Sequence, residues 1–428
     1  MKKFLAMILA LCMVLPLAAC GAKKEDEGAV YWLNFKPESK QALEELAAMY
    51  KEETGVKVKI VTAASGTYEE TLTAEMDKEQ APTLFVVADA AAAREWSDYC
   101  LDLTGTAIAN ELNTDAYNVY DAGGKLCAIG YCYECYGIIV NTKLLQQAGY
   151  TTDDITDFAS LKKVAEDITA RREELGFAAF TSAGMADSSS WRFTGHLINL
   201  EYYYESVDAP QDWVYAPAQI RGTYMDNYRA LYDLMIRNST VPPAMLTSDA
   251  LNAETEFING EAVFFVNGSW EWSALKAAGF KAEDVAMIPY YCGVAGEEMA
   301  GLNCGTENCW AINANATAAD RQATMDFMVW LVSDREASAK AVATFGAMPY
   351  VQAADFDNPF LADANDYAAA GHYTMPLLTN FQPNVNAYRA AAVSALNAYN
   401  ANPTDANWAD VETAFVAGWA TQYQNANK

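Results

Sequence analysis

Residues 257–275 read FINGEAVFFVNGSWEWSAL, and this stretch decides the expected fold. Its middle, AVFFV at 262–266, is an uninterrupted apolar run typical of a buried strand. Asn267-Gly268-Ser269 then indicates a turn, and a helix is expected over 270–277. The stretch therefore predicts a strand whose end delivers Trp270 at the start of a helix.

Strands and helices alternate on both sides of this stretch. The chain before it predicts strands at 29–35, 56–61 and 83–87, with helices at 39–54 and 68–78 between them. This order indicates an α/β lobe around a largely parallel sheet. At 428 residues the chain is too long for one compact core, so a second lobe is expected. Further along the chain, strands are expected at 125–129, 136–140 and 308–312, and helices at 158–175, 191–204, 218–237, 319–332, 385–399 and 406–422.

The composition excludes several classes of function. The chain has 56 acidic and 28 basic residues, which gives a net charge of −28. Such a surface repels phosphate backbones, so no nucleic-acid partner is expected. The histidines are His196 and His372 alone, which excludes a His-rich metal site. No metal or other cofactor is predicted.

Residues 1–19 are expected to be a signal peptide. Lys2 and Lys3 precede an apolar run over 4–17 that is too short to span a bilayer, and no later stretch is long and apolar enough to do so. The run ends in LAACG, in which Cys20 matches the lipidated cysteine of a bacterial lipobox; the alternative is an ordinary secretory signal with a chance cysteine. Residues 20–28 then form a polar tether. Loss of the two lysines takes the net charge from −28 to −30.

Several stretches resemble one known family in the same order along the chain. Residues 257–275 carry its phrase of Asn-Gly-Glu, an apolar strand and Asn-Gly-x-Trp. Residues 124–145, GKLCAIGYCYECYGIIVNTKLL, are similar to its crossing segment, and the opening strand and helix ending in TGVKVKI and residues 81–89 also match. The chain thus resembles the extracellular solute-binding lipoproteins of carbohydrate ABC importers (family 1), typified by maltose-binding protein.

The resemblance implies a two-lobe periplasmic-binding-protein-like α/β fold with an interlobe hinge and a ligand cleft. It assigns 29–132 and 303–346 to the N-terminal lobe, and 137–300 and 349–428 to the C-terminal lobe. It further implies a monomer, not an enzyme, that captures a sugar or short oligosaccharide and delivers it to ABC transporter permease subunits. The expected location is the extracytoplasmic face of the cell membrane, held by the lipid anchor alone.

Two other functions stay open beside sugar capture. A surface-anchored glycoside hydrolase needs two carboxylates at a defined separation, and the sequence marks no such pair. A binding protein for a non-sugar solute is possible on the same fold.

The resemblance also selects ligand-site residues, because a pyranose offers apolar faces to aromatic rings and hydroxyls to carboxylates and amides. Trp270 takes the family's stacking position, with a core tryptophan as the alternative; Trp272 is expected to point elsewhere. Glu134 matches a sugar-contacting carboxylate, or is a hinge carboxylate. The other candidates, for which packing, capping or solvation are the alternatives, are Asp89, Asn34, Lys36, Glu38, Trp191, Arg192, Asn267, Glu307 and Trp310.

The sequence departs from the maltose-type pattern after Met375-Pro376. The family has an aromatic pair at a helix start there, and this chain has Asn386-Ala387, with Phe381 and Tyr388 nearby. The departure argues against a maltodextrin ligand and leaves the identity of the sugar open.

The mature chain has seven cysteines beyond Cys20, an odd number that leaves at least one thiol unpaired within the chain. Cys304 and Cys309 bracket a Gly-containing turn, and are expected to be either a local disulfide or buried thiols. Residues 127–135 show the C-x₄-C-x₂-C spacing of plant-type iron–sulfur proteins, but in an apolar strand-like segment, so no cluster is predicted. A redox pair within this segment is disfavoured, because no helix start follows it.

Overall fold

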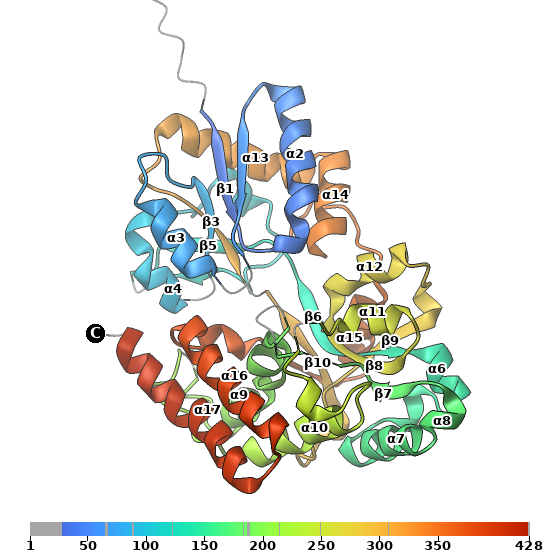
Figure 1. Cartoon of the computed structure of the whole chain (residues 1–428). Coiled ribbons are helices and arrows are strands. Elements are labelled where there is room, and N and C mark those ends of the chain that lie inside the picture. The colour runs from blue at the N-terminus through green and yellow to red at the C-terminus, as the bar shows by residue number, and fades with distance from the viewer. Residues whose placement is uncertain are drawn as a thin grey trace, which may run out of the picture.

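The structure, a computed structural model, describes residues 28–426 apart from 65–66, 88–89, 122, 183, 186–188, 214, 249 and 307. The predicted signal peptide, Cys20 and most of the tether lie outside the described residues, as do Asp89 and Glu307. The described chain folds into two α/β lobes, one above the other in Figure 1. The predicted fold class is therefore confirmed.

The N-terminal lobe is built on a mixed sheet with the order β2-β1-β3-β11-β5-β4. The first strands pair in parallel, as predicted: β1 (Val30–Asn34) with β2 (Val58–Thr62) and β3 (Leu84–Val87). The rest of the sheet is antiparallel, and consists of β11 (Cys309–Ile312), β5 (Leu126–Gly130) and β4 (Val119–Tyr120). The prediction of a largely parallel sheet is wrong for this half, because β11 returns from the other lobe and pairs antiparallel on both of its edges.

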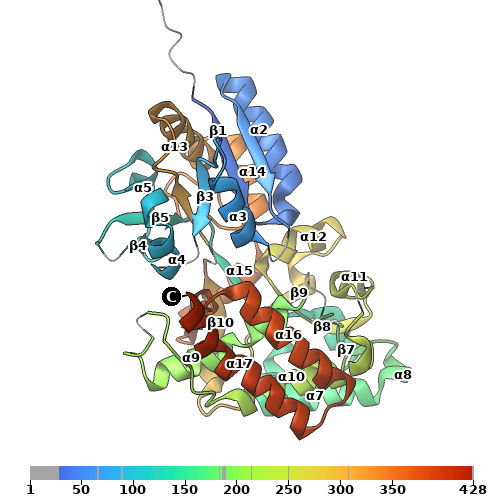
Figure 2. The same ribbon diagram turned by 60° about the vertical axis from the view of Figure 1, so that its left-hand side comes forward.

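The helices of this lobe bury apolar stripes against the sheet. In α2 (Lys40–Thr54) the helically spaced Leu43, Leu46, Ala47 and Tyr50 are all buried, and the helix ends at Gly55 in the left-handed conformation. The same core receives α13 (Ala318–Ser333) and α14 (Arg335–Phe345). Toward the other lobe lie α3 (Tyr68–Met76) and α4 (Ala90–Glu95), as Figures 1 and 2 show.

The C-terminal lobe has a second mixed sheet with the order β12-β10-β6-β8-β7, and β9 pairs with β6. Its central strands are β6 (Glu134–Asn141) and β8 (Ala262–Gly268), which are buried along their whole length. The other strands are β7 (Ala178–Phe180), β9 (Val285–Ile288), β10 (Ala300–Gly305) and β12 (Tyr373–Met375). Because β10 stays in this sheet up to Gly305, the lobe boundary predicted at 303 falls inside a C-terminal-lobe strand.

Helices surround this second sheet and bury its faces. The predicted helix over 191–204 is split into a π-helical turn, Arg192–Leu197, and α9 (Asn199–Asp208). The others that matter for the site or the hinge are α10 (Met225–Arg237), α12 (Trp272–Ala277), α15 (Pro359–Ala369), α16 (Val385–Ala401) and α17 (Asp405–Ala426). Among the described helices, none combines the length and apolarity needed to cross a membrane.

The chain passes between the lobes in the middle of both sheets. Residues 131–133 join β5 to β6, residues 306–308 join β10 to β11, and residues 346–358 join α14 to α15. The strand orders therefore place two interlobe regions on opposite sides of the crossing segments. β1 and β8 lie on one side of the crossing strands in their sheets. β4 and β12 lie on the other side, where residues 116–121 and the segment after β12 line one cavity.

The cysteines decide between two alternatives left open by the sequence. None of the seven described cysteines forms a disulfide, and all are buried, so the alternative of buried thiols holds for Cys304 and Cys309. Cys304 lies opposite Cys135 in the β10–β6 ladder, while the thiol of Cys309 is 3.3 Å from the carbonyl oxygen of Tyr117. The two residues therefore belong to different sheets and have different neighbours.

A pair of buried carboxyl groups in α9 holds the chain ahead of α10. Glu205 accepts hydrogen bonds from the N–H groups of Arg221 (2.8 Å) and Thr223 (3.1 Å), and Glu201 accepts one from the N–H of Tyr224 (2.6 Å). Burial, together with a hydrogen bond to Glu205 and the charge of Glu205, raises the pKa of Glu201 to about 9. At neutral pH the native chain therefore keeps a proton on Glu201.

We expect Glu201→Gln to raise the free energy of unfolding at pH 7 by about 1–2 kcal/mol. Glutamine keeps an acceptor for Tyr224 and a donor for Glu205 without needing a proton. Between pH 4.5 and about 9 the native Glu201 still holds its proton, whereas the unfolded chain has already released it. The free energy of unfolding of the wild type therefore falls as the pH rises through that window. Denaturant unfolding from pH 5 to pH 8 should give a flatter pH dependence for the variant. Parallel curves would contradict the assignment of the proton to Glu201.

Candidate functional site

Trp270 lies in a short 3₁₀ turn, Ser269–Glu271, between the end of β8 and α12. Its side chain is half-buried, and the six-membered part of the indole packs against Gly268. A Cβ atom added to Gly268 would lie 2.1 Å from Cζ3 of Trp270. The backbone of Gly268 is extended, with φ −128°, so the ring and not the backbone requires glycine here.

We expect Gly268→Ala to displace the Trp270 indole and to destabilise the fold by about 1–3 kcal/mol, as overpacking does elsewhere. The clash involves one side chain, so the same substitution in a Trp270→Ala background should cost much less. Thermal and denaturant melts of both single variants and the double variant measure this coupling. An equal cost of Gly268→Ala in both backgrounds would show that another neighbour, not Trp270, excludes the methyl group.

Trp270 belongs to a cluster of aromatic rings from separate elements of the C-terminal lobe. Its ring centroid lies 5.9 Å from that of Trp191 and 5.5 Å from that of His196, which occupies the π-helical turn. Behind them His196 stacks on Tyr136 of β6 at 3.9 Å with an interplanar angle of 5°. Tyr136 and His196 are buried, whereas Trp191 and Trp270 are half-buried. The buried pair therefore supports two indoles that keep exposed surface.

Polar groups lie directly against these indoles. The guanidinium carbon of Arg192 is 4.3 Å from the centroid of the Trp191 ring, and its Nε donates to the carbonyl oxygen of Val266 (3.0 Å). Asn267 donates from Nδ2 to Oε1 of Glu271 (2.7 Å). Arg192 and Asn267, both selected from the sequence, thus hold fixed positions beside the rings.

Glu271 completes this polar group and was not predicted. Burial raises its pKa to about 7; the charge of Arg192 opposes this shift, and the charges of Glu254 and Glu38 add to it. Since Glu38 follows β1, its influence indicates that this part of the N-terminal lobe faces the Trp270 region. The one signal in the sequence was the position of Glu271 between Trp270 and Trp272.

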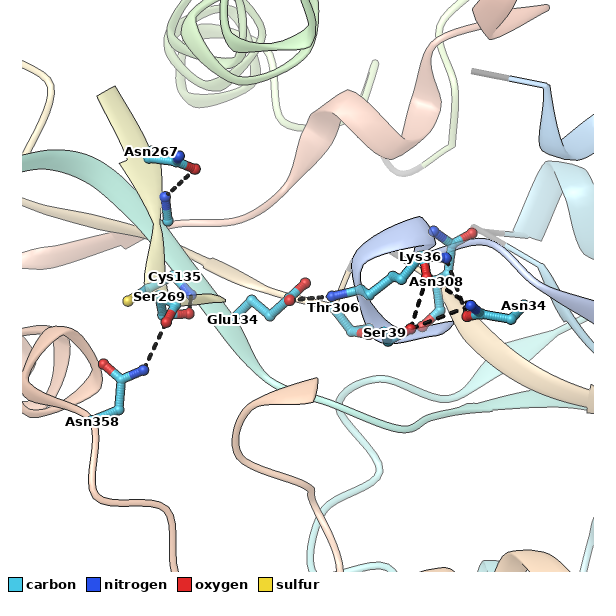
Figure 3. Close-up of polar contacts among 11 residues, drawn as sticks. Asn34, Lys36, Ser39, Glu134, Cys135, Asn267, Ser269, Thr306, Asn308 and Asn358 are labelled. Atoms are coloured by element: carbon cyan, nitrogen blue, oxygen red, sulfur yellow. Dashed lines mark hydrogen bonds and ion pairs between the residues drawn. The ribbon is translucent and has the colours of Figure 1, made fainter. Parts of the chain in front are cut away.

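Lys36 and Glu134 form a buried ion pair, shown in Figure 3. Lys36 lies in the loop after β1, and Glu134 is the first residue of β6, so the pair connects the N-terminal lobe to a crossing strand. Their side chains are 7% and 2% exposed. Burial lowers the pKa of the Lys36 ammonium, but the charge of Glu134 outweighs burial, and the net pKa is raised. The Lys36 ammonium therefore stays charged.

The neighbouring candidates have different roles. Asn34 is buried and shapes the Lys36 loop: Nδ2 donates to the carbonyl oxygen of Lys36 (2.7 Å), and Oδ1 accepts from its N–H (3.1 Å). Glu38 is exposed at the tip of this loop. Trp310 is fully buried in the core of the N-terminal lobe, stacked on Tyr131 at 4.9 Å. We therefore do not retain Trp310 as a ligand contact, because a buried ring offers no surface.

The lobes also meet at Asn386, which marks the departure from the maltose-type pattern. Its Nδ2 donates to Oε2 of Glu70 over 2.9 Å, from α16 to α3. Both side chains come from helices that face each other across the interlobe region in Figure 2. In place of an aromatic platform, the structure has a lobe–lobe hydrogen bond at this point.

A cavity of about 730 Å³ lies between the lobes on the β4 side of the crossing segments. Its walls come from 116–121 of the N-terminal lobe and 376–381 of the C-terminal lobe, with 304–306 between them. None of the predicted ligand residues that the structure describes lines this cavity. Nor do the described residues contain a group of three or more His, Cys, Asp or Glu side chains placed to hold a metal ion.

Residues 45–357 match the family of bacterial extracellular solute-binding proteins, and the chain belongs to that family. This match confirms the family predicted from the sequence, whose members are solute-binding proteins.

Solved structures share the fold. RafE in complex with raffinose has a TM-score of 0.69 at 16% identity, over 90% of this chain and 98% of that one. A sugar transporter from Bacillus licheniformis in complex with stachyose has a TM-score of 0.68 at 14% identity, over 92% and 100%. A chitin oligosaccharide binding protein has 0.67 at 17% identity, over 93% and 99%. No curated protein matches the chain.

Proposed function

We propose that this solute-binding protein captures a sugar or short oligosaccharide between its lobes and delivers it to the permease subunits of an ABC importer. The observation that carries the proposal is the pair of half-buried indoles, Trp191 and Trp270, beside the polar side chains of Arg192 and Glu271. Pyranose rings stack on aromatic faces, and their hydroxyls need such charged and amide partners. Proteins of the same fold are named for raffinose, stachyose and chitin oligosaccharide, which supports a saccharide ligand.

Each proposed contact has a part in this capture. Trp270 and Trp191 stack on the sugar, while Arg192 and Glu271 receive its hydroxyls and the buried Asn267 positions Glu271 through its Nδ2 hydrogen bond. The Lys36–Glu134 pair lies where the lobes join, so a ligand hydroxyl that reaches it would contact both lobes at once. Glu38, Asp89 and Glu307 complete the proposed ligand site, and the protein acts as a monomer without metal, cofactor or nucleic acid.

Thermal-shift screening against mono- and oligosaccharides tests the proposal. A ligand that binds only the native state raises Tm, by an amount that grows with its concentration above Kd. We expect at least one saccharide to raise Tm, with no change in that saccharide on long incubation. Stabilisation by amino acids, peptides or polyols alone would identify a receptor for another solute. Release of reducing sugar that a single Asp or Glu substitution removes would identify a glycoside hydrolase instead.

We further propose that the protein is anchored to the extracytoplasmic face of the membrane through a lipid on Cys20. The lipobox-like LAACG sequence supports this anchor. We expect Cys20→Ala to release the protein from the membrane fraction. Mass spectrometry should find a lipid on the N-terminus of the wild type and none on the variant. Membrane retention of an unlipidated Cys20→Ala protein would contradict the anchor.

A further inference from the structure

The cavity on the β4 side has features that the proposed sugar site does not use. It is separated from Trp270 and Trp191 by the crossing segments, since β4 and β12 lie at the sheet edges opposite β1 and β8. Its volume of about 730 Å³ lies in the range of small-molecule sites. The cavity is therefore large enough for a ligand of its own.

Aromatic side chains from both lobes line this cavity. Tyr117 and Tyr120 come from the N-terminal lobe, and Tyr215 and Phe381 from the C-terminal lobe. Tyr120 is 46% exposed and Tyr215 is 62% exposed, which places them among the few large apolar side chains on the surface of the described chain. Exposed aromatic rings on the walls of one cavity provide stacking surfaces for sugar rings.

The charged lining residues indicate which kind of saccharide fits. Asp121 is already engaged: Oδ1 accepts from the N–H groups of Gly123 (2.8 Å) and Lys125 (3.0 Å), and Oδ2 accepts from Ser97 (2.9 Å). Arg94, at the end of α4, is exposed and has no ion-pair partner among the described residues. A guanidinium fork matches a carboxylate in geometry and charge. The Arg94 guanidinium on the cavity wall favours an anionic ligand over a cation.

We propose that this cavity is a second saccharide-binding site, which takes a uronic-acid-containing oligosaccharide with its sugar faces on Tyr120 and Tyr215 and a carboxylate on Arg94. The site goes beyond the proposed function, because it uses none of the residues around Trp270. Because residues of both lobes line the cavity, such a ligand contacts both lobes at once.

Calorimetric titration of the mature protein tests this site. The probes are oligogalacturonates of two to four units, with galactose oligomers of matched length as neutral controls. We expect the oligogalacturonates to bind more tightly than the neutral oligomers, and Arg94→Gln to weaken that binding about tenfold or more. Tyr215→Ala should weaken it as well, whereas Trp270→Ala should leave it unchanged. Both Arg94 and Tyr215 are exposed, so melting curves should show intact folds.

Three results would overturn the proposal. Failure of every oligogalacturonate to bind would remove the ligand class, and equal binding by Arg94→Gln would remove the role of the guanidinium. Loss of oligogalacturonate binding in Trp270→Ala would place the ligand at the first site. Because the two sites are probed by separate variants, failure of the sugar site around Trp270 leaves the expected result at this cavity unchanged.

Discussion

Trp270→Ala should abolish most saccharide binding while leaving the fold nearly intact. The indole is half-buried, packs on Gly268 and keeps exposed surface beside Trp191. Removal of a stacked ring forfeits the apolar contact with a sugar face, so we expect a loss on the order of 2–3 kcal/mol, or roughly 30- to 150-fold in affinity. Calorimetric titration with a saccharide found by thermal shift measures the effect, and melting of the ligand-free variant checks the fold.

Trp272→Ala is the matched control, because it removes the same side chain two residues away. Trp272 is 4% exposed, and its Nε1 donates to the carbonyl oxygen of Asp357 (2.9 Å), as expected for a tryptophan that points away from Trp270. Trp272→Ala should lower the free energy of unfolding by about 3–5 kcal/mol. Its affinity for the saccharide should stay unchanged at temperatures below the unfolding transition. Unchanged affinity in Trp270→Ala, or collapse of its ligand-free fold, would remove Trp270 from the site.

The sequence predicted the local path of the chain well where a strand, a turn and a helix follow one another. The strand expected at 262–266 is β8, and the turn at Asn267-Gly268-Ser269 leads into Trp270 as predicted. By contrast, β10 was not predicted, because AGLNCG lacks both alternation and β-branched residues. Its place in the sheet is fixed by pairing with β6 and β12, which no local pattern records.

The arrangement of the site depends on contacts between distant segments. Trp191 and Trp270 follow β7 and β8, two neighbouring parallel strands, and their ring centroids lie 5.9 Å apart. The sequence placed each near the ligand but gave no reason for His196 and Tyr136 to support them. Likewise Lys36 and Glu134 were each expected to contact ligand, and their mutual pairing follows from the close approach of the β1 loop to β6.

Lys36→Met should be the most destabilising substitution at the lobe junction, with a loss of about 3–5 kcal/mol in the free energy of unfolding. The change leaves the Glu134 carboxylate without its cation in a position where its side chain is 2% exposed. A buried carboxylate that loses its partner takes up a proton more readily, so its pKa should rise in the variant. The loss should therefore be largest at neutral pH and shrink as the pH falls. Denaturant unfolding at pH 7 and pH 5 measures both effects.

The matched control is Lys340→Met, which breaks an ion pair within the N-terminal lobe. Lys340 pairs with Glu45 on the surface, where the two side chains are 32% and 47% exposed. Water solvates the remaining carboxylate there, so the loss should be much smaller than the loss in Lys36→Met. At the buried site, Glu134→Gln in the Lys36→Met background should restore most of the lost stability, because it removes the buried charge that Lys36 balanced. Equal losses for Lys36→Met and Lys340→Met would mean that solvent reaches Glu134, and that the junction between the lobes is more open than this ion pair implies.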